Sequence, residues 1–209
     1  MTKSIITDAF DRMPEDASEA EWREFFMLVE SIAINGNFEI QPEAQITIAI
    51  LYENGVGVLK DIEKSIDWYT KAAERGLAEA QYLLGEFYDN HSYINERYQQ
   101  KSAKWIEKAA ENGHVQAQHK LSYVYNYGRG VHKDHKQAIK WCRKAAEQGY
   151  VSAQVELGHQ YSYGVNLSKD LFKATEWYSK GAKQGSTEAK CALDELYEAG
   201  WAVHLFDVN

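Results

Sequence analysis

The sequence predicts an all-α protein built from stacked pairs of helices. Four tryptophans follow one another at intervals of 37, 36 and 36 residues: Trp68, Trp105, Trp141 and Trp177. Five tyrosines keep the same step: Tyr52, Tyr88, Tyr125, Tyr161 and Tyr197. A glycine also recurs three residues after an Ala-Ala or Gly-Ala pair. A fixed period of roughly 20 to 50 residues is typical of repeat proteins, whose units bury their apolar faces against one another.

The first helix of each unit, helix A, is expected to open near a recurring alanine: Ala44, Ala80, Ala117, Ala153 and Ala189. Apolar residues follow four and eight positions later, as in Ala117, Leu121 and Tyr125, and this spacing places them on one helical face. Glycine replaces a larger residue at Gly85 and Gly158. We expect these glycines to let a neighbouring helix approach closely.

The loop and the second helix, helix B, complete the unit. Helix A ends in Gly-x-Gly at residues 55–57 and 128–130, and in the variant Gly164-Val165-Asn166. Gly or Asn at the third place predicts a positive backbone φ there. An aspartate then stands where helix B should begin and is suited to cap it: Asp61, Asp134 and Asp170.

These markers resemble a known family. Residues 117–121, 125–131, Asp134, 138–141 and 144–149 look like one complete Sel1-like repeat, which is similar to the tetratricopeptide repeat. The resemblance implies an α-solenoid of antiparallel helix pairs, wound as a right-handed superhelix, that serves as a protein-interaction scaffold without chemistry of its own. Residues 91–95 depart from the glycine loop, and the cysteine pairs of the family's disulfide-stapled members are missing.

This pattern divides the chain into three parts. Residues 1–43 form an acidic segment with a divergent capping helix from Ala20 to Gly36. Residues 44–200 form the solenoid of about four to five repeats, with boundaries near 44–79, 80–116, 117–152 and 153–188 and a half repeat at 189–200. Residues 201–209 form an apolar tail, which either covers the last helix or docks a partner.

Charge and composition argue against several classes of partner and location. The net charge is −8, and residues 1–43 hold 10 acidic and 3 basic side chains. This sign argues against a nucleic-acid partner and favours a basic protein partner. The chain lacks an apolar run of about 18 residues and an apolar leader, so we expect neither a membrane span nor secretion. With only Cys142 and Cys191, we expect a cytoplasmic protein with inert thiols.

No motif predicts catalysis, a metal or a cofactor. Gly-x-Gly follows a helix rather than a strand, so it does not fit a dinucleotide site. His132, Asp134 and His135 lie close together, but Asp134 has a capping role and the other repeats supply no ligands at the two histidine positions, so no metal site is predicted. No nucleophile stands at a recognisable spacing from a base.

The remaining question is which helix A residues the repeat leaves free for binding. At 100° per residue, one side of each helix A lies opposite the buried positions, and by analogy with tetratricopeptide stacks this side should line a concave groove. The predicted partner-binding residues are Glu79, Tyr82, Glu86, Asp89, His119, Tyr123, Asn126, Tyr127, Val155, His159, Ser162, Tyr163, Glu195 and Glu198.

Three functions fit this groove. The first is a non-enzymatic interaction module that binds a basic protein or peptide partner. The second is an immunity or antitoxin-like protein that occludes a bacterial toxin. The third is a hydrolase that uses His119, His159 and Glu86. The sequence does not indicate an oligomeric state.

Overall fold

The computed structural model describes residues 6, 13, 14, 16–36, 40–93, 95 and 97–200. Regular structure in these residues is helical throughout, which confirms the predicted fold class. The chain divides into two compact units, Met1–Asn90 and His91–Asn209, which we call unit 1 and unit 2. The predicted tail at residues 201–209 lies outside the described residues.

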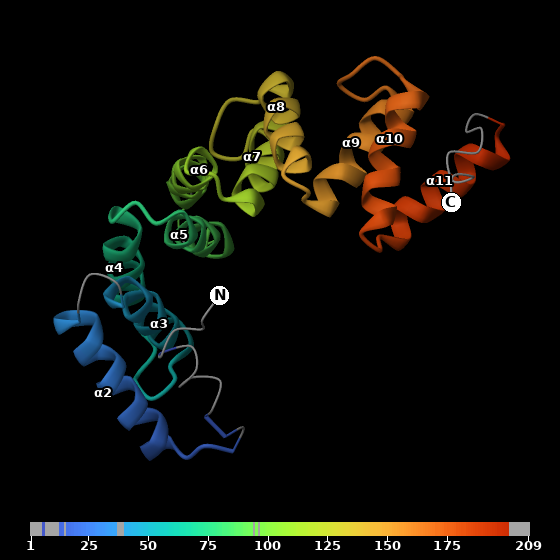
Figure 1. Cartoon of the computed structure of the whole chain (residues 1–209). Coiled ribbons are helices and arrows are strands. Elements are labelled where there is room, and N and C mark those ends of the chain that lie inside the picture. Colours follow the sequence, from blue (N-terminus) through green and yellow to red (C-terminus); the bar gives the residue numbers. More distant parts are fainter. Residues whose placement is uncertain are drawn as a thin grey trace. The chain divides into compact units, whose positions relative to one another are not determined.

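Each unit is a row of helices (Figure 1). Unit 1 contains α2 (Glu19–Asn35), α3 (Gln41–Asn54), α4 (Ile62–Glu74) and α5 (Ala78–Asn90). Unit 2 contains α6 (Arg97–Glu111), α7 (Val115–Tyr127), α8 (His135–Glu147), α9 (Val151–Tyr163), α10 (Leu171–Lys183) and α11 (Thr187–Glu198). Within each unit, a helix packs mainly against the helices before and after it. This nearest-neighbour packing of antiparallel helix pairs is the organisation of a solenoid.

The A helices are α3, α5, α7, α9 and α11, and they begin two or three residues before the predicted alanines. Local capping explains the earlier start of two of them. His114 precedes α7, and its Nδ1 accepts a hydrogen bond from the Ala117 amide at 3.2 Å. Ser186 precedes α11, and its Oγ accepts from the Ala189 amide at 3.2 Å. These caps satisfy amide groups that a helix start leaves without partners.

The B helices in the described residues are α4, α6, α8 and α10, and the predicted aspartate caps are confirmed. Asp61 Oδ1 accepts from the Lys64 amide at 3.0 Å, Asp134 Oδ1 from the Gln137 amide at 3.1 Å, and Asp170 Oδ1 from the Lys173 amide at 3.0 Å. The hydrogen bond from the Lys173 amide is the main reason why the pKa of Asp170 lies below its usual value. The starts of α4, α8 and α10 are therefore set by residues within one turn of them.

The third loop position has the predicted positive φ. The angle is 67° at Gly57, 74° at Gly130 and 61° at Asn166. A Cβ at Gly57 would collide with the Trp22 carbonyl group, and one at Gly130 with the Gln99 carbonyl group. Glycine at these two places therefore satisfies both the backbone conformation and a close approach to a neighbouring helix.

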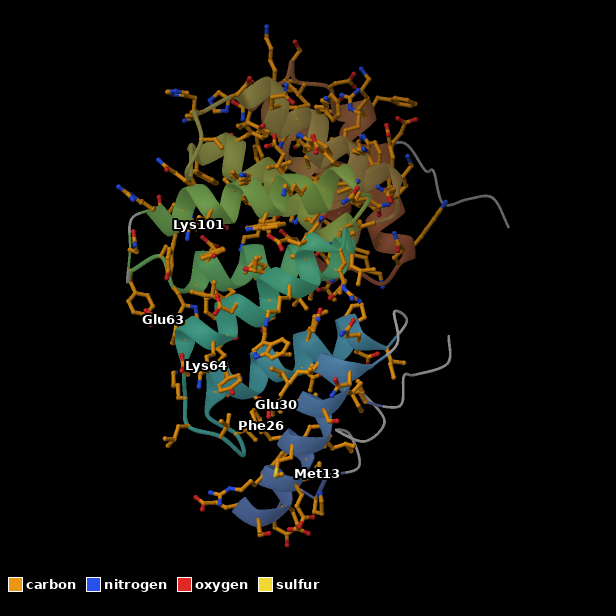
Figure 2. All side chains as sticks on the ribbon, turned by 90° about the vertical axis from the view of Figure 1, so that its left-hand side faces the viewer. Met13, Phe26, Glu30, Glu63, Lys64 and Lys101 are labelled. Carbon is orange, nitrogen blue, oxygen red and sulfur yellow. The ribbon has the colours of Figure 1, made fainter. Side chains whose placement is uncertain are left out.

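The predicted capping helix is α2, which begins one residue earlier and ends at Gly36 as expected. A capping box precedes it, because the Ser18 amide donates to Glu21 Oε2 at 2.7 Å while the Glu21 amide donates to Ser18 Oγ at 3.3 Å. Phe26 points from α2 toward α3, where its ring meets Tyr52 edge to face at 5.3 Å (Figure 2). This pair belongs to the core that joins α2 to the first repeat.

Candidate functional site

Nine of the ten predicted binding residues of unit 2 occupy equivalent repeat positions of α7, α9 and α11, where their side chains are exposed or half-buried. We call this surface the A-helix face, and its residues are His119, Tyr123, Asn126, Tyr127, His159, Ser162, Tyr163, Glu195 and Glu198. Tyr127 and Tyr163 are more exposed than Tyr123, at 65% and 69% against 41%. This exposure leaves their rings available to a partner.

Two tyrosines of α7 form a stack on this face. The rings of Tyr123 and Tyr127 lie 6.2 Å apart with an interplanar angle of 8°. On its other side, Tyr123 meets the His119 ring edge to face at 5.0 Å, and His119 also lies 5.1 Å from the Tyr150 ring. One aromatic row therefore runs along α7 from a half-buried histidine to an exposed tyrosine.

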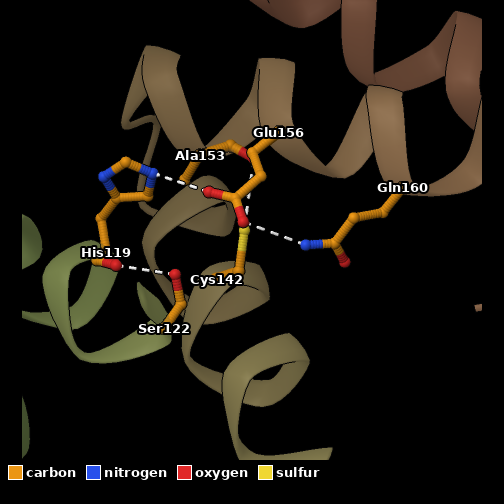
Figure 3. A network of polar contacts seen from close by, with 6 residues as sticks. All are labelled: His119, Ser122, Cys142, Ala153, Glu156 and Gln160. Carbon is orange, nitrogen blue, oxygen red and sulfur yellow. Dashed lines mark hydrogen bonds and ion pairs between the residues drawn. The ribbon is translucent and has the colours of Figure 1, made fainter. Parts of the chain in front are cut away.

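A carboxylate that the sequence pattern did not single out holds this row in place (Figure 3). Glu156 of α9 accepts from His119 Nε2 at 3.0 Å through Oε2 and from Gln160 Nε2 at 3.1 Å through Oε1. The side chains of His119 and Glu156 are 13% and 22% exposed. An ionised carboxylate only accepts hydrogen bonds, so the histidine nitrogen that faces it carries the proton.

The same carboxylate affects the pKa of two further groups. Burial, together with the charge of Glu156 and a hydrogen bond to it, raises the pKa of Tyr123 to about 12. Burial also raises the pKa of the Cys142 thiol, and Glu156 adds to this shift in the same way. Cys142 Sγ also lies 3.6 Å from the Ala153 carbonyl oxygen, so the thiol stays protonated, in agreement with the prediction that it is inert.

We call the arrangement of α7, α8 and α9 around Glu156 the polar junction. Its members are His119, Ser122, Cys142, Ala153, Glu156 and Gln160. Ser122 is 1% exposed, and its Oγ donates to the His119 carbonyl oxygen at 2.7 Å. Hydrogen-bonded side chains of three helices therefore meet here, beside an apolar cluster of α8 and α9 that includes Cys142, Ala153 and Leu157.

The next junction, between α9, α10 and α11, holds different residues at the same repeat positions. A shift of 36 residues converts the polar set into Val155, Gly158, Tyr178, Ala189, Ala192 and Leu196. We call this set the apolar junction. Its residues other than Gly158 belong to one hydrophobic cluster, and the ring of the buried Tyr178 occupies the space that a Cβ at Gly158 would need. The close approach predicted at Gly158 is confirmed.

The apolar junction corrects one predicted site residue. Val155 was expected on the binding face, but it is only 4% exposed and packs in the core. Its side chain faces α10, where a Cβ at Gly181 would lie 3.4 Å from Val155 Cγ2. His119 occupies the equivalent position of the preceding repeat. Its side chain is longer and polar, so it extends to Glu156 and also contacts the ring of Tyr123.

Two other residues of the face also have partners. His159 lies 6.0 Å from the Tyr163 ring and 5.4 Å from the Tyr178 ring, and its Nε2 is 3.9 Å from Glu188 Oε1. Asn126 Oδ1 accepts from Asn166 Nδ2 at 3.2 Å and lies 2.8 Å from His135 Nδ1. Asn126 therefore ties α7 to two following segments.

The predicted residues of α5 lie in the other unit. Glu79 is exposed, whereas Tyr82, Glu86 and Asp89 are half-buried in unit 1. The residues proposed for a hydrolase are likewise divided, because Glu86 belongs to unit 1 and His119 and His159 to unit 2.

Glu156, Gln160 and Cys142 are members of the site that helical periodicity does not reveal, because they do not lie on the outward face. Their signal in the sequence is a departure from the repeat: Glu156 corresponds to Lys120 and Ala192, and Gln160 to Val124 and Leu196. A polar residue beneath the surface, at a place where another repeat is apolar, indicates a role other than repeat stacking.

The described part of the chain also bears on metal binding and membrane insertion. No group of three histidine, cysteine or acidic side chains is arranged to hold a metal ion there. None of the helices in this part combines the length and apolarity that crossing a bilayer requires.

Comparison with known proteins identifies the repeat. The Sel1 repeat model matches residues 42–77, 78–114, 115–150 and 151–186, starting two residues before each predicted boundary. No curated protein matches the chain. Among solved structures, a Sel1 repeat protein from Oxalobacter formigenes is 34% identical, with a TM-score of 0.75 over 87% of this chain and 74% of its own.

Of two other similar structures, one is much longer than this chain and the other is less similar to it in sequence. The protein c5321, a protective antigen present in uropathogenic Escherichia coli strains, is 35% identical with a TM-score of 0.74; the match covers 84% of this chain and only 36% of c5321. Immunity protein Pa5087 from Pseudomonas aeruginosa shares the fold at 24% identity and a TM-score of 0.52, over 88% of this chain and 66% of its own. Because the repeat model matches four consecutive repeats over more than half of the sequence, this chain belongs to the Sel1 repeat family.

Proposed function

We propose that this chain is a non-enzymatic module that binds a protein or peptide partner through the A-helix face of unit 2. The observation that carries the proposal is the polar junction, which lies beneath the exposed tyrosine stack. Burying polar side chains costs free energy unless each has a partner, and the neighbouring junction is packed with apolar residues instead. The polar junction therefore has a purpose beyond stability, which is to hold His119 and Tyr123 in a fixed geometry.

The chemistry of the face suits a binding role. Tyrosine supplies a large contact area with few rotatable bonds, and tyrosines are enriched among the residues that dominate interface energetics. Tyr123 and Tyr127 are 41% and 65% exposed and already stacked on each other. Their side chains would therefore lose little conformational freedom when a partner binds them.

We propose a basic partner, as expected from the acidity of the sequence. The acidic side chains of α11 lie at one end of the face: Glu188, Asp194, Glu195 and Glu198, against one basic residue, Lys190. Exposed carboxylates of this kind steer association and select among partners more than they add affinity. The α5 residues Glu79, Tyr82, Glu86 and Asp89 stay a prediction for unit 1.

A toxin is the second candidate partner, which would make the chain an immunity protein. The fold is compatible with that role, since an immunity protein of Pseudomonas aeruginosa has it. The two free thiols, Cys142 and Cys191, are compatible with a cytoplasmic location. Co-expression with the product of a neighbouring reading frame tests this candidate: rescue of growth supports it, and absence of rescue by any neighbour removes it.

Catalysis by the face is not part of the proposal. The His119 nitrogen that points to α9 is occupied by Glu156, and the 3.9 Å contact of His159 is with an exposed glutamate. A hydrolase activity that disappears in His119→Ala while the helical content is unchanged would overturn this part of the proposal.

The binding proposal is tested with a double variant, Tyr123→Ala with Tyr127→Ala, in affinity purification from the source cells. Truncating anchor residues of an interface costs about 2 kcal/mol or more, so we expect the affinity for a captured partner to fall by about 30-fold. Phe172→Ala is the matched control, because Phe172 of α10 is 68% exposed and lies off this face. Equal capture by both variants, with unchanged circular dichroism, would contradict the proposal.

A further inference from the structure

The B helices of unit 2 form a second surface whose charge is opposite to that of the whole chain. The helices α6, α8 and α10 carry eleven basic and four acidic side chains, a net charge of +7 in a chain of −8. A net charge summed along the sequence does not reveal this surface, because acidic residues outside the three helices offset its positive charge.

The positive charge is concentrated on α8. Lys136, Lys140, Arg143 and Lys144 line a shallow hollow of about 480 Å³ together with Ile139 and Glu147. Lys136, Lys140 and Lys144 are exposed, and no described carboxylate lies within ion-pair distance of any of them. Arg143 donates to the Tyr161 hydroxyl group at 3.0 Å, which holds its guanidinium group in place. We call this hollow the basic hollow.

Tryptophans orient the lysines along the surface. The Lys108 ammonium lies 4.1 Å from the centre of the Trp105 ring, Lys144 lies 4.9 Å from Trp141, and Lys180 lies 3.8 Å from Trp177. A cation over an aromatic face is held electrostatically, and its side chain then loses less freedom when it binds an anion. The three B helices therefore present ordered cations at matching repeat positions.

The chain also carries a segment of complementary charge. Asp16, Glu19, Glu21 and Glu24 at the start of α2 are exposed and lie in the part of the sequence with a net charge of −7. Two copies that each carry −8 repel at long range, so an electrostatic contact between them requires opposite charges to be segregated onto different surfaces, as they are here.

We propose that the basic hollow of one copy binds the acidic start of α2 of a second copy, so that the chain self-associates head to tail. This contact joins two different surfaces, which makes it heterologous and extendable beyond a dimer. It uses the B helices and leaves the A-helix face of unit 2 free. Its success or failure is thus independent of the proposed binding function.

Sedimentation velocity of the purified chain tests the proposal at several protein concentrations, in about 50 mM and about 300 mM salt. The weight-average sedimentation coefficient should rise with concentration at low salt and stay constant at high salt, because salt shortens the range of exposed charges. Sedimentation that does not depend on concentration at low salt overturns the proposal.

A charge swap tests the contact itself. Lys140→Glu with Lys144→Glu should weaken self-association at least tenfold, since exposed ion pairs contribute little singly and several act together here. Glu19→Lys with Glu24→Lys should do the same, and an equimolar mixture of the two variants should associate again. A mixture that stays monomeric overturns the proposal.

Two controls complete the experiment. Lys169→Glu with Lys190→Glu changes the net charge by the same amount outside the basic hollow and should leave self-association unchanged. A polynucleotide is the other anion that such a surface could bind, although the net charge of the chain opposes it. Retention of a short DNA duplex by a chain that does not self-associate would replace the proposed contact with a nucleic-acid surface.

Discussion

The polar junction and the apolar junction of unit 2 occupy the same place in successive repeats but are held together differently. At the first, His119, Cys142 and Gln160 surround the Glu156 carboxylate. At the second, the ring of Tyr178 fills the space, and Val155 and Leu196 pack in the same cluster. The helices have 12 or 13 residues at both junctions, so the repeat backbone does not require either solution.

The difference shows how a repeat protein separates stability from specificity. Apolar contacts fill the second junction, whereas at the first, beside the apolar cluster of α8 and α9, hydrogen bonds fix the orientation of surface groups at a smaller net gain. Solenoid stability is a sum of local terms, so one junction can be specialised while its neighbours maintain the fold. Substitutions at equivalent positions of the two junctions test this division.

The largest effect is expected at the apolar junction. Tyr178→Ala removes a side chain that is 1% exposed and should lower the free energy of unfolding by about 3–5 kcal/mol. Cys142→Ala at the equivalent position removes one sulfur atom and should cost about 1 kcal/mol. Chemical denaturation followed by circular dichroism measures both values. Equal costs would show that the two junctions are not specialised.

A smaller effect is expected from the carboxylate of the polar junction. Glu156→Ala leaves donors of His119 and Gln160 without an acceptor and should cost about 1–3 kcal/mol. Glu156→Gln keeps an acceptor and should recover part of this loss in the same denaturation experiment. If Glu156→Ala is as stable as the parent chain, the network does not hold the junction together.

A third prediction concerns a hydrogen bond that one junction has and the other lacks. Arg143 donates to the Tyr161 hydroxyl group, whereas Ser179 Oγ and the Tyr197 hydroxyl group, 36 residues later, are buried without a partner. Ser179→Arg should provide the donor and raise the free energy of unfolding by about 0.5–1.5 kcal/mol. Arg143→Ser should lower it by a similar amount. A destabilised Ser179→Arg variant would show that the shorter side chain is required there.

The smallest effect is spectroscopic and concerns Tyr123. Its pKa is raised from the usual 10.0 to about 12, so the neutral hydroxyl group stabilises the fold fully below pH 10, and this contribution is lost as the pH rises through about 12. The tyrosinate absorbance of Tyr123→Phe, subtracted from that of the parent chain, isolates this titration. Glu156→Gln should move its midpoint toward 10. An unmoved midpoint would indicate that burial alone causes the shift.

The repeat, its aspartate helix caps and its loop conformations with positive φ could be predicted from the sequence. The caps at Asp61, Asp134 and Asp170 and the positive φ at Gly57, Gly130 and Asn166 depend on residues within one turn of the backbone concerned, and all six are confirmed. The capping box at Ser18 and the cap at His114 are equally local, but they do not recur with the repeat, so the periodic pattern does not reveal them.

The candidate site was predicted less completely. Helical geometry placed Tyr123, Tyr127 and Tyr163 on an exposed surface, and the structure agrees. The same geometry failed for Val155, because exposure at that position depends on whether the facing helix brings a ring or a thiol. The basic surface of the B helices was missed for a related reason, since charge counted along the chain averages over the faces of each helix.

The sequence by itself determined the repeat length, the aspartate caps of the B helices and the positive φ at the third loop position, because these follow from interactions between residues a few positions apart. Only the tertiary structure decided that His119 meets Glu156, 37 residues away, and that Tyr178 fills the gap left by Gly158. Such contacts depend on the volume and polarity of side chains from different helices. A periodic pattern places those side chains at equivalent positions, but it does not specify which of them touch.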